Sequence, residues 1–157
     1  LKSLKNNKNV FVEKPLCLSL KDSKIIHKTA KAVNKIIFTG HLLQYHSAFK
    51  ELKQKIKLGK IGNLQVIKAN RLNFGAVRKI ESVLYDLASH DLSMILSITK
   101  NHPIKVDVNA VFKNSKKIAD YINVVLYFEQ NIIAILNVDW ISPYKEHRFS
   151  VLGQKVV

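Results

Sequence analysis

The chain has 157 residues, 47% of them apolar, so it is long enough to fold around a buried core. No run of about 18 apolar residues occurs, so we expect no membrane span. The single cysteine, Cys17, excludes an internal disulfide framework and a thiolate-based zinc site, and it favours a reducing, cytoplasmic compartment. The first residues lack the apolar segment of a signal peptide.

The net charge of +15 raises the question of a nucleic-acid partner. Only three of the 26 basic residues are arginines, at positions 71, 78 and 148, and the lysines are scattered along the chain. Proteins that read bases rely on arginine, and phosphate-binding surfaces cluster their charge. We therefore expect no nucleic-acid partner, although the positive charge should help to attract anionic ligands.

The N-terminal part predicts a strand, a helix and a second strand. A β run at 9–12 ends before Pro15, and a β-branched run at 36–39 ends at Gly40-His41. Between them, Ser19 is placed to cap a helix that extends to about Asn34. Such a unit predicts two neighbouring parallel strands. Residues 13, 14, 40 and 41 then follow the carboxyl ends of the strands, where ligands of such sheets gather.

The remainder predicts a helix-backed sheet. The expected helices cover residues 47–58 and 84–99, and the expected strands cover 64–74, 104–112, 120–129, 132–140 and 147–152. Four successive strands with short connections argue for a mostly antiparallel sheet. The expected fold class is therefore α/β followed by α+β.

Two sets of residues suggest catalytic chemistry. Lys14 is restricted by Pro15, whose preceding peptide bond could be cis, and a fixed cation there can stabilise an alkoxide. Asp86 and His90 share one helix face, where a carboxylate can orient a histidine that acts as a general base. The alternatives are a solvated turn lysine and a helix-supporting surface pair.

Two further sets admit more than one interpretation. Arg71, Asn73 and Arg78 lie around the end of the long strand and could form an anion site, or an arginine could pair with Glu81. A metal site is also conceivable, but its spacing matches no recognised signature, so none is predicted. The side chains that such a metal site would use are His41, His46, Asp86, His90 and Asp91.

Taken in order, the residues Glu13-Lys14-Pro15, Gly40-His41, Arg71 with Asn73, and Asp86 followed by His90 resemble the Gfo/Idh/MocA oxidoreductase family. The resemblance implies that residues 1–45 are the C-terminal remnant of a dinucleotide-binding Rossmann domain. It implies that residues 46–157 form an α+β substrate and oligomerisation domain, truncated at its C-terminus. The implied cofactor is NAD or NADP, and the implied substrate is a sugar or nucleotide sugar.

The resemblance also assigns roles. Lys14, Asp86 and His90 would be catalytic and would converge on one cleft. Cofactor binding would fall to Glu13, Lys14, Pro15 and His41, and substrate binding to Arg71, Asn73 and Arg78. The sequence departs from the family at Gln44 and Ser47, where an arginine and a proline are common.

The five glycines include no G-x-G-x-x-G spacing, so we expect the chain alone to be inactive. The alternative function is a non-catalytic binding or assembly module left from a split or decayed oxidoreductase gene. The expected partners are further copies of the chain, docked through the antiparallel sheet, and a separate chain that carries the missing Rossmann half.

Overall fold

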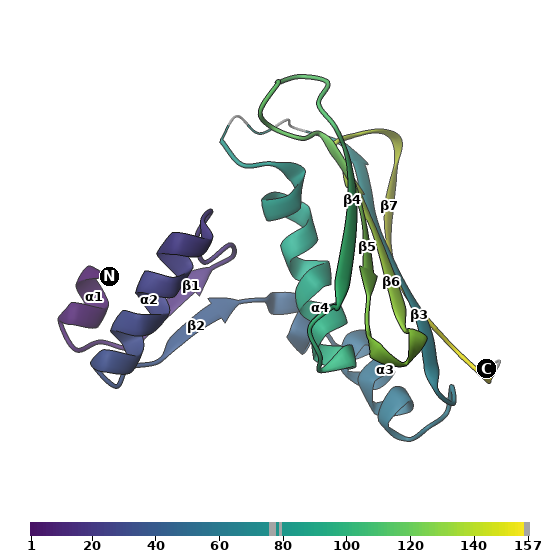
Figure 1. Ribbon diagram of the computed structural model, residues 1–157, viewed down its shortest axis with the longest axis horizontal. Helices are drawn as coiled ribbons and strands as arrows, with labels where there is room; N and C mark the ends of the chain where they lie inside the picture. Colours follow the sequence, from purple (N-terminus) through teal and green to yellow (C-terminus); the bar gives the residue numbers. More distant parts are fainter. Residues whose placement is uncertain (76–77, 79, 156–157) are drawn as a thin grey trace. The chain divides into compact units, whose positions relative to one another are not determined.

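The computed structural model of the protein describes residues 1–75, 78 and 80–155 (Figure 1). The chain divides into two compact units, Leu1–Leu42 and Leu43–Val157. This contact boundary lies near the predicted division at residue 45, which stays a prediction as a domain boundary. None of the helices in the described residues is long and apolar enough to cross a membrane.

The first unit contains the predicted parallel pair. Its elements are α1 (Lys2–Lys5), β1 (Val10–Glu13), α2 (Leu20–Ala32) and β2 (Ile37–Gly40). Strands β1 and β2 pair in parallel, with Val10 opposite Ile37 and Glu13 opposite Gly40, which confirms the expected pairing. Ser19 caps α2 as predicted, because its Oγ accepts a hydrogen bond of 3.1 Å from the backbone N–H of Asp22.

The second unit packs two helices against a five-stranded sheet. The helical elements are η1 (Leu42–Tyr45, which begins at the last residue of the first unit), α3 (Ser47–Lys57), the π-helix η2 (Leu84–Ala88), α4 (Ser89–Thr99) and η3 (Glu129–Asn131). The strands are β3 (Leu64–Phe74), β4 (Lys105–Val111), β5 (Tyr121–Tyr127), β6 (Ile133–Asp139) and β7 (Ile141–Gly153). Their order in the sheet is β4-β5-β6-β3-β7, and only the β3–β6 pair is parallel.

Strand β7 differs from the expectation that successive strands pair with each other. It begins at Ile141, six residues before the predicted strand, and it pairs with β3 rather than with β6. The chain crosses the end of β3 at Trp140, whose carbonyl accepts a hydrogen bond from the N–H of Gly75. Asp139 stabilises the crossing, because its carboxylate accepts hydrogen bonds from the N–H groups of Ile141 and Ser142.

The core lies between the sheet and the helices α3 and α4, which Figure 1 shows on the same side of the sheet. Alternate residues of the central strands are buried on that face, among them Ile67, Val124 and Leu136. Ile95 of α4 is fully buried against them. The predicted fold class is confirmed, since a short parallel α/β segment is followed by a helix-backed, mostly antiparallel sheet.

The other face of the sheet carries a row of side-chain amides. Asn123 donates to Asn137 at 2.8 Å, and Asn137 donates to Asn70 at 2.9 Å. Asn70 in turn donates to Glu146 at 3.0 Å, so one line of hydrogen bonds crosses β5, β6, β3 and β7. Each of these residues is partly buried, so the bonds are only partly exposed to competition from water.

Candidate active site

In the first unit, the candidate cofactor-side residues gather at the carboxyl ends of β1 and β2. Glu13 lies opposite Gly40, and the next residues in each chain segment are Lys14 and His41. Gly40 is buried, and a Cβ at this position would lie 3.1 Å from the Phe11 ring and 3.2 Å from a Glu13 carboxylate oxygen. The close approach of these side chains therefore explains the glycine.

The loop between β1 and α2 has the geometry that the proline suggested. The Lys14–Pro15 peptide bond is cis, and both residues are partly buried. His41 lies close enough to Lys14 to be affected by its charge. Burial lowers the pKa of His41, and the Lys14 ammonium lowers that pKa further, so both effects favour the neutral imidazole.

In the second unit, Asp86 and His90 lie on consecutive helical turns of different kinds. Asp86 belongs to the π-helix η2, and His90 belongs to the first turn of α4. The sequence predicted one continuous α-helix here, and the π turn is a difference that often accompanies functional sites. Both side chains are partly buried.

The two arginines of the predicted anion site have carboxylate partners. The Nε of Arg78 lies 3.4 Å from Asp86, so this arginine contacts a predicted catalytic residue rather than Glu81. Arg71 makes two hydrogen bonds to Asp91, with Nε to Oδ2 at 2.8 Å and Nη2 to Oδ1 at 2.9 Å. Asn73, near the end of β3, is exposed.

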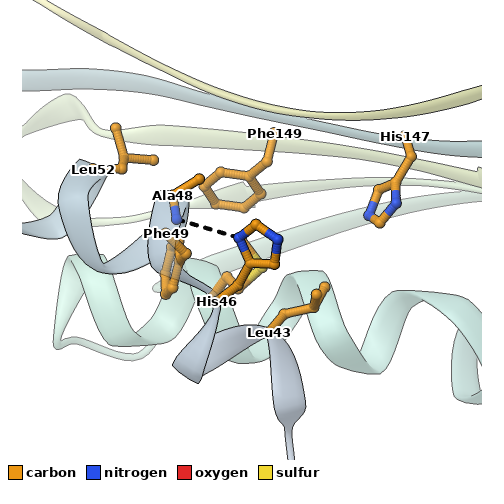
Figure 2. Close-up of a pocket in the computed structure, with 8 residues that line it drawn as sticks. Leu43, His46, Ala48, Phe49, Leu52, His147 and Phe149 are labelled. Carbon is orange, nitrogen blue, oxygen red and sulfur yellow. Dashed lines mark hydrogen bonds between the residues drawn. The ribbon is translucent and has the colours of Figure 1, made fainter.

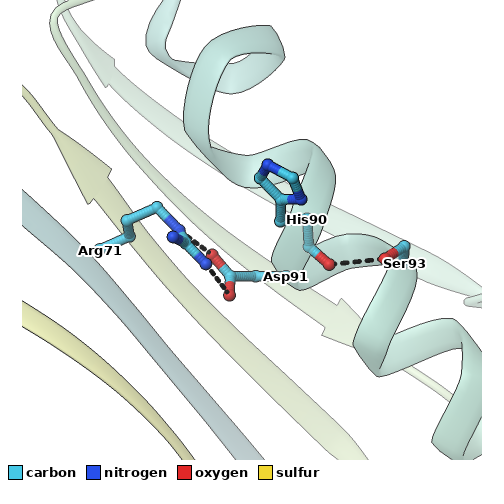
Figure 3. Close-up of polar contacts among 4 residues, drawn as sticks. All are labelled: Arg71, His90, Asp91 and Ser93. Carbon is cyan, nitrogen blue, oxygen red and sulfur yellow. Dashed lines mark hydrogen bonds and ion pairs between the residues drawn. The ribbon is translucent and has the colours of Figure 1, made fainter. Parts of the chain in front are cut away.

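The backbone of His90 is hydrogen-bonded to Ser93, which follows it on α4 (Figure 3). Ser93 donates its hydroxyl hydrogen to the backbone carbonyl of His90 at 2.7 Å. The same Ser93 oxygen accepts a hydrogen bond of 3.2 Å from the side chain of Gln44. Gln44 thus links η1 to the turn that carries His90.

A cavity of about 310 Å³ lies beside this region, between α3, α4 and β7 (Figure 2). Its walls are mostly apolar, and they include Phe49, Phe149 and Met94. Two histidines also line it. His46 caps α3 by accepting a hydrogen bond from the N–H of Ala48, and the pKa of His147 is lowered by partial burial and by the charge of Arg71.

Sequence reasoning missed Asp91 and His147 as parts of this region. Asp91 was considered only as a metal ligand, and the described residues contain no group of three or more side chains suited to hold a metal ion. Its adjacency to His90 was the available signal. His147 gave no signal, because its proximity to Arg71 depends on the pairing of β7 with β3.

Two protein-family models match the chain. Residues 1–41 match the oxidoreductase family with an NAD-binding Rossmann fold, and residues 49–156 match the Gfo/Idh/MocA C-terminal domain. A UDP-N-acetylglucosamine 3-dehydrogenase from Acidithiobacillus ferrooxidans has a similar fold, with a TM-score of 0.84 at 21% identity. That superposition covers 98% of this chain and 49% of the other.

Two inositol dehydrogenases are similar in sequence. The myo-inositol 2-dehydrogenase of Thermotoga maritima is 28% identical over 163 residues, which cover 96% of this chain and 48% of the relative. The NAD⁺-dependent scyllo-inositol 2-dehydrogenase of Bacillus subtilis is 30% identical over 96 residues, which cover 58% of this chain and 28% of the relative. The chain thus spans less than half the length of each.

The parallel N-terminal strands, the helix-backed sheet and these matches define a class of NAD-binding oxidoreductases with a Rossmann domain and an α+β domain. The chain belongs to the Gfo/Idh/MocA family, as the ordered residues of the sequence suggested. The predicted nicotinamide cofactor is confirmed at the level of the family. The roles of the individual site residues stay predictions.

Proposed function

We propose that the protein takes part in reversible hydride transfer between NAD and a hydroxyl-bearing carbon of a sugar, an inositol or a nucleotide sugar. The observation that carries the proposal is the placement of Asp86 and His90 on adjoining turns, with Arg78 against Asp86. The inositol dehydrogenases to which the chain is similar act on ring polyols, which supports the same chemical class.

In this proposal His90 removes the hydroxyl proton from the substrate. An imidazole is suited to this role because it exchanges protons near neutral pH. Asp86 orients the histidine or the sugar. The contact of Asp86 with Arg78, at 3.4 Å, restricts the side chain of Asp86, which supports an orienting role.

The first unit supplies the cofactor side. Glu13 ends β1, and Lys14, Pro15 and His41 follow the carboxyl ends of the parallel strands, where dinucleotides bind in such sheets, so the residues present fit a nicotinamide cofactor. When bound, the cofactor accepts or donates the hydride. Lys14 stabilises the developing negative charge on the substrate oxygen, and the neutral His41 beside it adds no competing positive charge.

An anionic part of the substrate would be bound by Arg78 and Asn73, both of which are exposed near the end of β3. Arg71 is also predicted to bind this anionic part, although two of its guanidinium nitrogens already donate hydrogen bonds to Asp91. Charge reversal at Arg78 should weaken the binding of a nucleotide sugar more than the binding of neutral inositol. Equal weakening of both ligands would contradict an anion site.

We also propose two protein partners, a second copy of this chain and a chain that carries further Rossmann strands. The sheet face that carries the amide row also presents partly exposed Val125 and Ile135, which supports docking of a second copy there. In the first unit, stacked and exposed Phe11 and Phe38 support contact with a chain that carries further Rossmann strands. Sedimentation as a monomer at all concentrations would contradict the homo-oligomer.

The function is tested by nicotinamide absorbance with a panel of inositols, sugars and nucleotide sugars. The 157 residues alone should give no turnover, because the sequence has no glycine-rich turn to hold the pyrophosphate. Fusion to the preceding half of the Rossmann domain of the Thermotoga maritima relative should give turnover.

The decisive variant in that fusion is His90→Asn, which should lower turnover by about 10²–10⁴-fold. His102→Asn is the matched control, because His102 is exposed and lies beyond the end of α4. Turnover that does not depend on His90 would contradict the assigned mechanism. Absence of turnover in a folded fusion that binds NAD would favour the alternative of a non-catalytic assembly module.

A further inference from the structure

The residue that follows His90 is a buried aspartate paired with an arginine of the sheet. Asp91 is 2% exposed, and both of its carboxylate oxygens accept hydrogen bonds from Arg71, at 2.8 and 2.9 Å (Figure 3). Two parallel hydrogen bonds between planar groups fix their relative orientation, which a single contact does not. The first turn of α4 is therefore constrained in rotation as well as in distance.

The other end of this contact lies on a rigid element. Arg71 is part of β3, which pairs with β6 on one side and with β7 on the other. Its guanidinium side chain is only 14% exposed. A helix turn bonded to an interior strand takes its position from the sheet, so the neighbouring His90 takes its position from the sheet as well.

The start of α4 lacks one usual means of fixing a helix end. No side chain caps the N-terminus of α4, and the turn before it is π-helical, a conformation that is rare and found mostly as single turns. The Ser93 hydroxyl bonds the carbonyl of His90 and links it to Gln44, but Ser93 belongs to the same helix. The Arg71–Asp91 ion pair links this turn directly to the sheet through side chains.

Stability alone is a weak reason for such a pair. Removing two charges from water costs about as much as their attraction returns, and apolar replacements of buried ion pairs are often neutral or stabilising. A buried pair next to a catalytic candidate is better explained by the geometry that it imposes.

We propose that Arg71 and Asp91 are positioning residues that set the orientation of His90 toward the substrate. The proposal rests on the proposed role of His90, and it gives Arg71 a structural partner in place of a substrate anion. The imidazole would be presented in one orientation while the ion pair is intact and in several when it is lost.

The test separates positioning from stability in the 157-residue chain. Asp91→Asn leaves the Arg71 charge without its partner and should lower Tm strongly. The double variant Arg71→Met with Asp91→Leu removes both charges at similar volume and should recover Tm to within a few degrees of the wild type. The matched control is Glu51→Leu with Lys55→Met, which removes an exposed pair of 2.9 Å from α3.

The deciding measurement is the NMR signal of the His90 imidazole, together with amide exchange along α4. In the double variant we expect a broadened or doubled His90 signal. Exchange at residues 90–93 should be at least about tenfold faster, with residues 94–98 little changed. A sharp His90 signal at its wild-type position, with wild-type exchange in the first turn, would overturn the proposal.

A second variant keeps the test decisive if the double variant does not fold. Arg71→Lys keeps the charge but loses the planar fork, so it should disturb the His90 signal with a smaller loss of Tm. An undisturbed signal there would also overturn the proposal. These readouts need neither substrate nor cofactor, so turnover independent of His90 would reject the proposed function without altering their result.

Discussion

The two units of the chain differ in how much of their apolar surface they bury. In the second unit, the sheet and helices enclose a continuous core that includes Ile67, Ile95 and Leu136, each fully buried. In the described residues of the first unit, the buried apolar side chains are Leu4 and Ala30, while Phe11 is 60% exposed.

This contrast indicates different roles for the two units. Parallel sheets are normally covered on both faces, and an isolated two-stranded sheet is marginally stable. In the proposed function, the first unit contributes residues of its strand ends, although the described residues of that unit form no large core. The second unit provides the rigid platform from which β3 and α4 present their side chains.

The largest expected effect contrasts the two units directly. Leu136→Ala removes a fully buried side chain from the second unit and should lower the free energy of unfolding by about 2–5 kcal/mol. Phe11→Ala in the first unit should cost less than about 1 kcal/mol, because the ring is mostly exposed. Urea denaturation of both variants measures the difference. Equal losses would mean that Phe11 is covered in solution.

A smaller loss of stability is expected when a side chain that accepts hydrogen bonds from backbone N–H groups is removed, and each unit contains such a side chain. Asp120 is fully buried and accepts hydrogen bonds from the N–H groups of Lys113 and Asn114, so Asp120→Ala should cost about 1–3 kcal/mol. Ser19→Ala removes the cap of α2 and should cost about 1 kcal/mol. Thermal unfolding of the two variants orders these losses, and a larger loss for Ser19→Ala would reverse the comparison.

The pH dependence of Asp120 gives a companion measurement. Burial raises the pKa of this carboxyl, but the hydrogen bonds from Asn114 and Lys113 outweigh burial, so the pKa is lowered overall. The stability that it contributes is present above its ordinary pKa of 3.8 and is lost as the pH falls through the folded-state value. In Asp120→Ala this part of the acid destabilisation should disappear.

The smallest expected effect concerns one histidine in each unit. Burial lowers the pKa of both His41 and His147, so the unfolded chain binds these protons more readily. The free energy of unfolding should therefore fall as the pH decreases below about 6.5. Lys14→Gln should raise the pKa of His41 only in part, because burial is the larger cause.

NMR titration of the imidazole signals measures these shifts. Lys145→Gln is the matched change in the second unit. It should raise the pKa of His147 only slightly, because burial and Arg71 lower that pKa more than Lys145 does. A His41 that titrates at or above 6.5 would contradict the effect of burial in the first unit.

Local rules of sequence predicted much of the fold. The parallel pair followed from a strand, a helix and a strand in succession, and the cap at Ser19 followed from residue type and spacing. The change to a sheet unit followed from the successive β runs. These features depend on residues close together in the sequence, which is why pattern reasoning reaches them.

Other features depend on long-range pairing and could not be predicted. The pairing of β7 with β3 places His147 opposite Arg71, residues that the sequence separates widely. The bond between Arg71 and Asp91 joins a strand to a helix, and an aspartate at a helix start is usually solvated. The π turn at 84–88 has no recognised sequence signature. Local patterns suggested Lys14 and the pair Asp86 and His90 as candidates, and the family resemblance assigned their catalytic roles.

The amide row has a consequence for how the sequence can change over generations. Asn123, Asn137 and Asn70 each make a hydrogen bond to a side chain on the adjoining strand. Replacing one of them therefore leaves a neighbouring amide without that hydrogen bond. Sliding β5 against β6 by two residues in either direction would set an amide against Ile135 or Val125, so the row also marks the correct alignment of these strands. Substitutions along the row should therefore be tolerated mainly in combination, so that relatives either share the row or replace it as a whole.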